Sequence, residues 1–81
     1  MDQDAVSMKF LKTELQTGIT FADVALTARY ADKVERNKAN ARKAYDTALR
    51  FLEKTRPECA SQLETLIKHL RSKLEALGES L

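Results

Sequence analysis

Apolar residues in the last third of the chain recur at alternating spacings of four and three. This spacing places them on one side of a helix, and such a side must be buried against another part of the protein. Two earlier series keep a comparable spacing, so we expect three amphipathic helices. The three series are Met8, Leu11, Leu15, Ile19, Ala22 and Leu26, then Val34, Ala41, Tyr45, Ala48 and Leu52, and finally Leu63, Ile67, Leu70, Leu74, Leu77 and Leu81.

Capping residues indicate where these helices begin and end. Pro57 cannot lie inside a helix, but Thr55 as N-cap and Glu58 three residues later suit a helix that starts beside it. Asp32 and Glu35 repeat this capping box, so Asp32 is the expected N-cap of the middle helix. The expected helices cover about residues 4–30, 33–55 and 57–78.

Gly18 leaves one boundary open. It can end a helix over residues 4–17, with Thr20 capping the next one. Yet the apolar spacing continues through Gly18, and a helix interior tolerates glycine at a cost of roughly 1 kcal/mol relative to alanine. We prefer a continuous helix, with a kink or break near Gly18 as the alternative, because three helices of similar length bury their apolar faces together.

The chain is therefore expected to form one domain, residues 1–81, with an all-α fold: an antiparallel three-helix bundle. With 81 residues it lies near the lower limit at which a single core stabilises a fold. Val, Ile and Thr never alternate with polar residues over the length of a strand. The regular apolar series also argue against disorder.

The predicted core combines small and large side chains. Small residues let neighbouring helices approach closely, while leucines and phenylalanines fill the wider gaps. The small residues are Ala41, Ala44 and Ala48, beside Tyr45, Leu49 and Leu52, and the phenylalanines are Phe10, Phe21 and Phe51. The last leucine series is also compatible with a seam for self-association, so a homodimer is an alternative to burial within one chain.

Charge is unevenly distributed. The formal net charge of +2 lacks the strong basic excess of a typical nucleic-acid binder. Residues 29–56 nevertheless carry nine basic and four acidic residues. Four of the basic residues fall on one narrow stripe of the middle helix, opposite its apolar side: Arg36, Lys43, Arg50 and Lys54.

This basic stripe has three interpretations: a solvated helix surface, a contact surface for a partner protein, or a surface that binds phosphates of nucleic acid or anionic lipid. Acidic residues four positions away, Asp32 for Arg36 and Asp46 for Arg50, are expected to pair with the stripe and to weaken its field. No exposed aromatic residue is expected along it for base stacking.

Few residues point to catalysis. His69 is the only histidine, and its helical neighbours Thr65, Ser72 and Lys73 are not a set of metal ligands. Cys59 and His69 lie about 15 Å apart along one helix, too far for a nucleophile and its base. Glycines are isolated, so no phosphate-binding loop is present. We expect no enzyme, no catalytic or metal-binding residue and no cofactor.

The expected location is the cytoplasm. A lone cysteine, Cys59, excludes an intrachain disulfide and suits a reducing compartment. The first residues include Asp2 and Asp4 rather than a basic segment followed by an apolar one, so no signal peptide is predicted. No apolar run approaches the ~20 residues that span a bilayer. We expect a soluble protein without membrane contact.

Residues 22–55 resemble two families of helical hairpin. The run from Ala41 through Tyr45 to Ala48 and Leu49 resembles the second helix of a tetratricopeptide repeat. The microtubule-interacting-and-transport domain, a three-helix module, is similar over a longer stretch that includes Ala28 and Asp32, with one inserted residue. The resemblance implies a groove between helices that binds short peptides of partner proteins. Plain helix packing explains the same residues, so no binding residue is transferred.

The sequence thus indicates a protein-interaction or structural module. The expected mechanism is a groove between helices, or a residual apolar surface, that accepts a helix or peptide of another protein. The alternative is weak nucleic-acid binding through Arg36, Lys43, Arg50 and Lys54.

Overall fold

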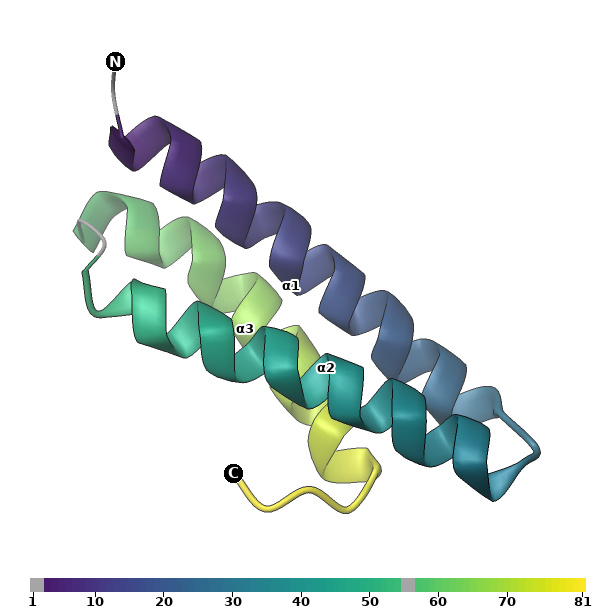
Figure 1. Ribbon diagram of the computed structural model, residues 1–81. Coiled ribbons are helices and arrows are strands. Elements are labelled where there is room, and N and C mark those ends of the chain that lie inside the picture. Colours follow the sequence, from purple (N-terminus) through teal and green to yellow (C-terminus); the bar gives the residue numbers. More distant parts are fainter. Residues whose placement is uncertain (1–2, 55–56) are drawn as a thin grey trace.

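Three helices make up the fold: α1 (Gln3–Thr27), α2 (Ala31–Leu52) and α3 (Pro57–Ala76). This computed structural model describes residues 3–54 and 57–81, with side chains for 8–54 and 60–81. The helices form an antiparallel bundle in which every pair is in contact (Figure 1). The predicted all-α, three-helix architecture is confirmed. Among the described residues, no helix combines the length and the apolar character that crossing a bilayer requires.

The helices begin within two residues of their predicted starts and end two or three residues early. α1 runs through Gly18 without a break, which removes the alternative of two shorter helices. α2 starts at Ala31 with Tyr30 as N-cap, and no side chain caps it. The prediction of Asp32 as N-cap is therefore wrong. Asp32 lies in the first turn instead, where a carboxylate is stabilised by the positive end of the helix dipole. The predicted capping box at residues 55–58 lies outside the described side chains.

A glycine turn ends α3. Gly78 adopts a φ of +89°, a conformation that favours glycine. The N–H groups of Gly78 and Glu79 donate to the carbonyls of Glu75 and Leu74, each at 3.0 Å. These two bonds form a Schellman motif. The chain then turns back towards α2 (Figure 1). Leu81 is consequently 38% exposed, and its predicted place in the apolar series of the last helix is wrong.

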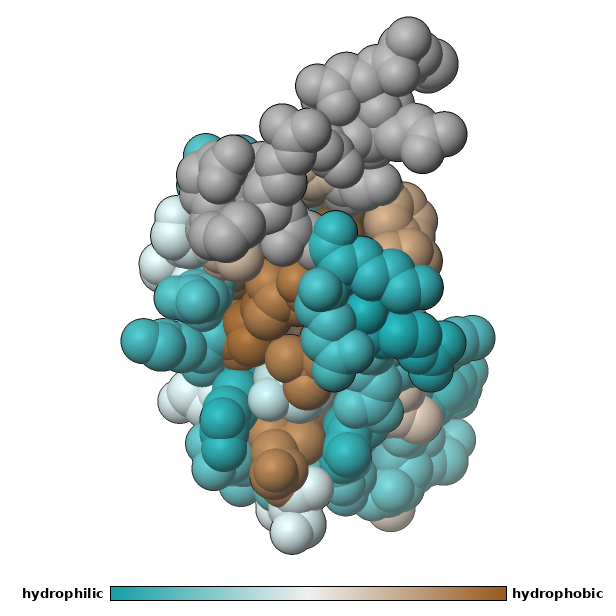
Figure 2. Space-filling view, turned by 90° about the vertical axis from the view of Figure 1, so that its left-hand side faces the viewer, coloured by the Kyte–Doolittle hydropathy of each residue, from teal (hydrophilic) through white to brown (hydrophobic). Residues whose placement is uncertain are grey.

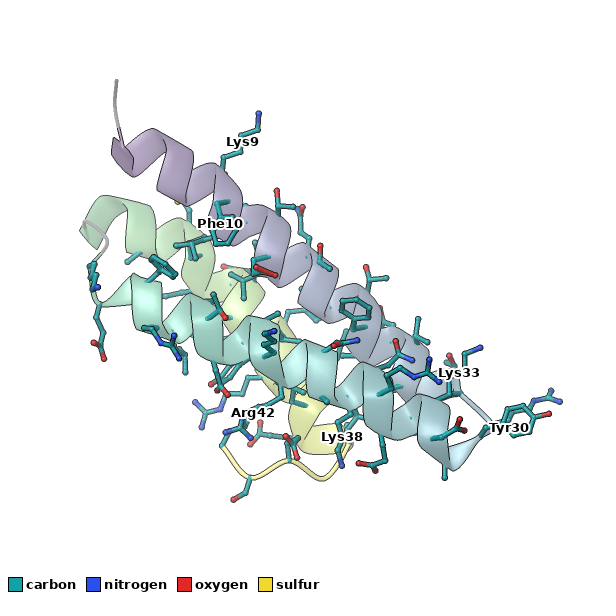
Figure 3. The ribbon with its side chains drawn as sticks, in the orientation of Figure 1. Lys9, Phe10, Tyr30, Lys33, Lys38 and Arg42 are labelled. Atoms are coloured by element: carbon teal, nitrogen blue, oxygen red, sulfur yellow. The ribbon has the colours of Figure 1, made fainter. Side chains whose placement is uncertain are left out.

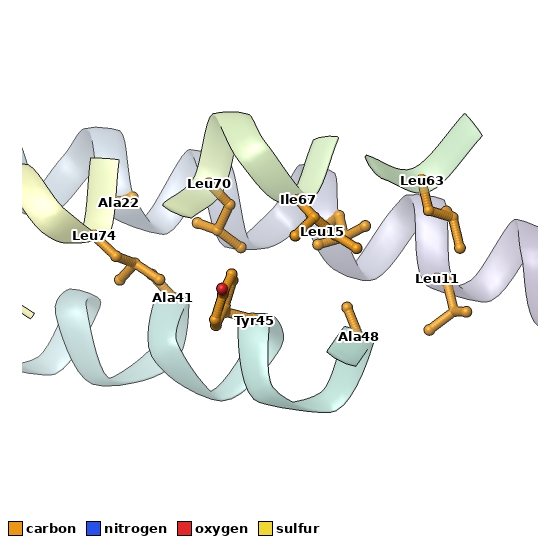
Figure 4. Packing of buried hydrophobic residues seen from close by; sticks show 10 residues of the cluster. All are labelled: Leu11, Leu15, Ala22, Ala41, Tyr45, Ala48, Leu63, Ile67, Leu70 and Leu74. Atoms are coloured by element: carbon orange, nitrogen blue, oxygen red, sulfur yellow. The ribbon is translucent and has the colours of Figure 1, made fainter. Parts of the chain in front are cut away.

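The core is one cluster of apolar side chains between the three helices (Figure 4). Complete burial of a leucine stabilises a fold by about 1.5–3 kcal/mol. All three predicted series contribute to the cluster. Its members are Leu11, Leu15, Ala22, Ala41, Tyr45, Ala48, Leu63, Ile67, Leu70 and Leu74.

Several large apolar residues predicted to be buried are exposed instead. α3 ends before the turn between α1 and α2 (Figure 1), so no third helix covers Leu26, which is 43% exposed. Leu49 is 36% exposed on α2. Phe10 and Phe51 contact each other edge to face, with ring centroids 6.2 Å apart, but both stay more than one third exposed. Of the three phenylalanines, Phe21 alone packs against the core.

At Gly18, α1 packs closely against both other helices. A Cβ added at this position would lie 2.8 Å from the Cβ of Ala44 and 2.9 Å from Cδ2 of Leu70. The Leu70 methyl can rotate away, but the Cβ of Ala44 moves only with the backbone of α2. The bundle therefore requires glycine here for close packing, where the sequence indicated only that the helix tolerates it.

Leu70→Ala tests the assignment of the core. Because Leu70 is fully buried, we expect the free energy of unfolding to fall by about 2–5 kcal/mol in denaturant titrations. Leu26→Ala, at an exposed position of the same residue type, is the control and should cost less than ~1 kcal/mol. Equal losses at the two positions would contradict the assignment.

Gly18→Ala tests the close packing of α1. Helix propensity alone favours alanine by about 1 kcal/mol, but the clash with Ala44 should instead destabilise the protein by about 1–3 kcal/mol. Gln16, exposed two residues earlier, supplies the control, since its alanine variant should be more stable than its glycine variant. A gain in stability for Gly18→Ala, measured by chemical denaturation, would show that the helices have room for a methyl group.

Candidate functional site

The four basic residues of the predicted stripe lie on the outward side of α2, and we call them the cationic face. Arg36, Lys43 and Arg50 belong to α2, and Lys54 follows its last turn; all four are exposed. Positions seven residues apart lie two turns apart on a helix, about 10.5 Å along its axis. The structure thus presents these cations to solvent in a row.

The acidic partners of this face differ from the predicted ones. Oδ2 of Asp32 lies 3.8 Å from Nη2 of Arg36, so this predicted pair is confirmed. Asp46 contacts Arg42 rather than Arg50, and its two carboxylate oxygens accept hydrogen bonds from Nε of Arg42 at 3.1 and 3.3 Å. The predicted pair of Asp46 with Arg50 is therefore wrong. In the described part of the chain, Lys43 and Arg50 have no ion-pair partner.

A shallow groove of about 570 Å³ runs along this side of α2, and we call it the α2 groove. One wall comes from α2, and Glu79, in the segment that follows α3, lies on the other side. Arg42 and Lys38 both point from α2 towards that segment (Figure 3). The lining includes Lys38, Arg42, Lys43, Asp46, Arg50 and Glu79.

Arg42 is the centre of the polar contacts in this groove. Besides its bonds to Asp46, its Nη1 donates to Oε1 of Glu79 at 3.1 Å and to the carbonyl of Ser80 at 3.4 Å. The hydrogen bonds to Asp46, and then to Glu79, raise the pKa of Arg42 above its usual value. The guanidinium therefore keeps its positive charge and links α2 to the segment after α3.

Arg42 and Glu79 were not recognised from the sequence. They are separated by 37 positions, and no local spacing connects them. The one available signal was Gly78, because a glycine at the end of a helix reverses the chain and directs the next residues back across the bundle. That signal gives a direction for Glu79 but no partner.

Apolar surface lies on the same side of α2 as Arg42. Leu49 follows Arg42 by seven residues, about two helical turns, and is partly exposed. Figure 2, which views the bundle from the left-hand side of Figure 1, shows apolar surface as a column between hydrophilic borders. A partner that contacts Arg42 can therefore also meet the apolar side chain of Leu49.

The chemistry available at this site is anion binding. Arginine binds carboxylates and phosphates with several directed N–H groups, and lysine adds a compact positive charge. In the described ranges, no three side chains of His, Cys, Asp and Glu gather closely enough to hold a metal ion. His69 is exposed on α3, and Cys59 lies outside the described side chains.

Comparison of the chain with known protein families, with curated proteins and with solved structures found no match. The resemblance of residues 22–55 to tetratricopeptide and microtubule-interacting modules stays an interpretation of the sequence. Ala41, Tyr45 and Ala48, which carry that resemblance, belong to the core.

Arg42→Met tests whether Arg42 holds the segment after α3. Methionine keeps much of the side-chain volume but removes every hydrogen bond, so residues 79–81 should become mobile in ¹⁵N relaxation measurements. The unfolding midpoint should change little, because partly exposed ion pairs contribute little to stability. Arg36→Met, which removes the exposed pair with Asp32, should leave residues 79–81 ordered. Unchanged order in both variants would show that other contacts hold the segment.

Proposed function

We propose that the chain is a protein-interaction module whose α2 groove binds an acidic segment of a partner protein. One observation carries the proposal: among the described residues, Lys43 and Arg50 are exposed and have no ion-pair partner, and they lie beside a groove in which Arg42 already binds a carboxylate. Unpaired cations next to a directed carboxylate site are suited to further carboxylates.

The spacing of the cations suggests the form of the partner. Two glutamates seven residues apart on a helix lie about 10.5 Å apart, which matches the separation of Lys43 and Arg50 along α2. An apolar residue of the partner can contact the exposed part of Leu49. We therefore propose an acidic amphipathic helix as the occupant, bound mainly through charge and a small apolar contact.

Nucleic-acid binding is the second candidate. The row from Lys43 through Arg50 to Lys54 consists of exposed cations, and phosphates bind such rows without sequence preference. The lining of the α2 groove includes no aromatic side chain on which bases stack. For this reason we favour the protein partner.

The other expectations from the sequence form part of the same proposal. We propose that the module acts in the cytoplasm, binds without catalysing a reaction, and uses no metal or cofactor. A second copy of the chain is an alternative partner, supported by the apolar side chains that α2 exposes, Leu49 and Phe51.

Charge reversal tests the proposed function. The probe is a fluorescent helical peptide with glutamates seven residues apart, and its scrambled form has the same composition. The double variant Lys43→Glu, Arg50→Glu should lower the affinity for the probe by at least about tenfold in anisotropy titrations. Lys68→Glu, at an exposed position of α3 outside the groove, should leave it nearly unchanged.

Duplex DNA in the same titrations decides between the two candidates. If DNA binds more tightly than the ordered peptide, and its log affinity falls steeply with log salt concentration, nucleic acid is the better assignment. The absence of any binding to the peptide at low salt, or equal binding of ordered and scrambled peptides, would contradict the proposed acidic helix.

A further inference from the structure

The segment after α3 occupies one edge of the α2 groove. Glu79 lies there with its side chain 23% exposed, and its Oε1 accepts the hydrogen bond from Nη1 of Arg42. The carbonyl of Ser80 accepts a second, longer bond from the same nitrogen. The protein thus binds one of its own carboxylates in the groove that we assign to an acidic segment of a partner.

We propose that Glu79 is a built-in competitor for the acidic partner, so that binding of the partner displaces Glu79 from Arg42. This inference rests on the proposed function of the α2 groove. It adds a selection rule: the groove rejects isolated carboxylates and accepts segments that carry several.

The geometry of Arg42 makes the competition direct. Its Nε is occupied by Asp46, and its Nη1 by Glu79 and Ser80. Asp46 is part of α2 and stays beside Arg42. A carboxylate from outside that binds the two terminal nitrogens, Nη1 and Nη2, together therefore does so only when Glu79 leaves Nη1.

Tethering explains the selection rule. Glu79 is joined to α3 by the short turn at Gly78, so its effective concentration at Arg42 is on the order of millimolar. A single free carboxylate does not overcome such a competitor at lower concentrations. A segment that also contacts Lys43 and Arg50 gains additional binding energy there and replaces Glu79.

Gly78 supplies a way to weaken the competitor without changing the groove. Its φ of +89° directs Glu79 towards α2, and alanine adopts such a φ only with strain. A Cβ at Gly78 would meet no atom within 4 Å. Gly78→Ala therefore acts through the backbone turn alone, whereas Glu79→Gln removes the charge of the competing group.

The test measures binding of the glutamate peptide described above to Glu79→Gln and Gly78→Ala. Both variants should bind the peptide about two- to fivefold more tightly than the unmodified protein, since the contact that they weaken is a partly exposed ion pair. Glu64→Gln, which removes the same charge from an exposed position of α3 outside the groove, is the control and should bind as the unmodified protein does. In the unmodified protein, NMR signals of Glu79 and Ser80 should shift on addition of the peptide.

The outcomes separate this inference from the proposed function. Peptide binding that depends on Lys43 and Arg50 but is unchanged or weakened in Glu79→Gln overturns the competitor and leaves the function standing. An equal gain in Glu64→Gln also overturns it, because net charge alone then explains the effect. If none of the proteins binds the peptide, Glu79→Gln included, the proposed function itself is overturned.

Discussion

The close contact of α1 with the other two helices at Gly18 determines the geometry of this protein. With hydrogen in place of a methyl group, α1 comes within reach of both Ala44 and Leu70. Ala41 and Ala44 face α1 and the core, and Arg42 and Lys43 lie between them in sequence. The packing of the two alanines therefore fixes the rotation of α2. That rotation directs Arg42 towards the segment after α3 and Lys43 towards solvent.

The sequence predicted the architecture because burial follows helical periodicity. Leu63, Leu70 and Leu74 repeat at spacings of seven and four, which a helix places on one side, and each is fully buried. Periodicity does not give the distance between helices or the extent to which one helix covers another. This is why the role of Gly18 was underestimated and why Leu26 was wrongly assigned to the core.

The candidate site was predicted in part for a related reason. The exposure of Lys43 and Arg50 follows from their position opposite the apolar side of α2, so the sequence was sufficient to place them. The partner of Asp46 could not be predicted in this way, since Arg42 and Arg50 both lie four residues away from it. The structure shows Arg42 held by two carboxylates, one of them from Glu79. A contact between residues so far apart in sequence depends on tertiary structure.

Because α3 ends before the turn between α1 and α2, the bundle has a part packed from three helices and a part packed from two. Near Leu15, Tyr45 and Leu70, side chains from all three helices pack together and exclude water. At the turn between α1 and α2, where Tyr30 is 71% exposed, only α1 and α2 pack against each other. Amide hydrogens at that end are therefore expected to exchange with solvent through local opening more readily than those of the three-helix part. The turn between α1 and α2 can therefore open locally while the middle of α2, where Arg42 contacts Glu79, stays packed against the core.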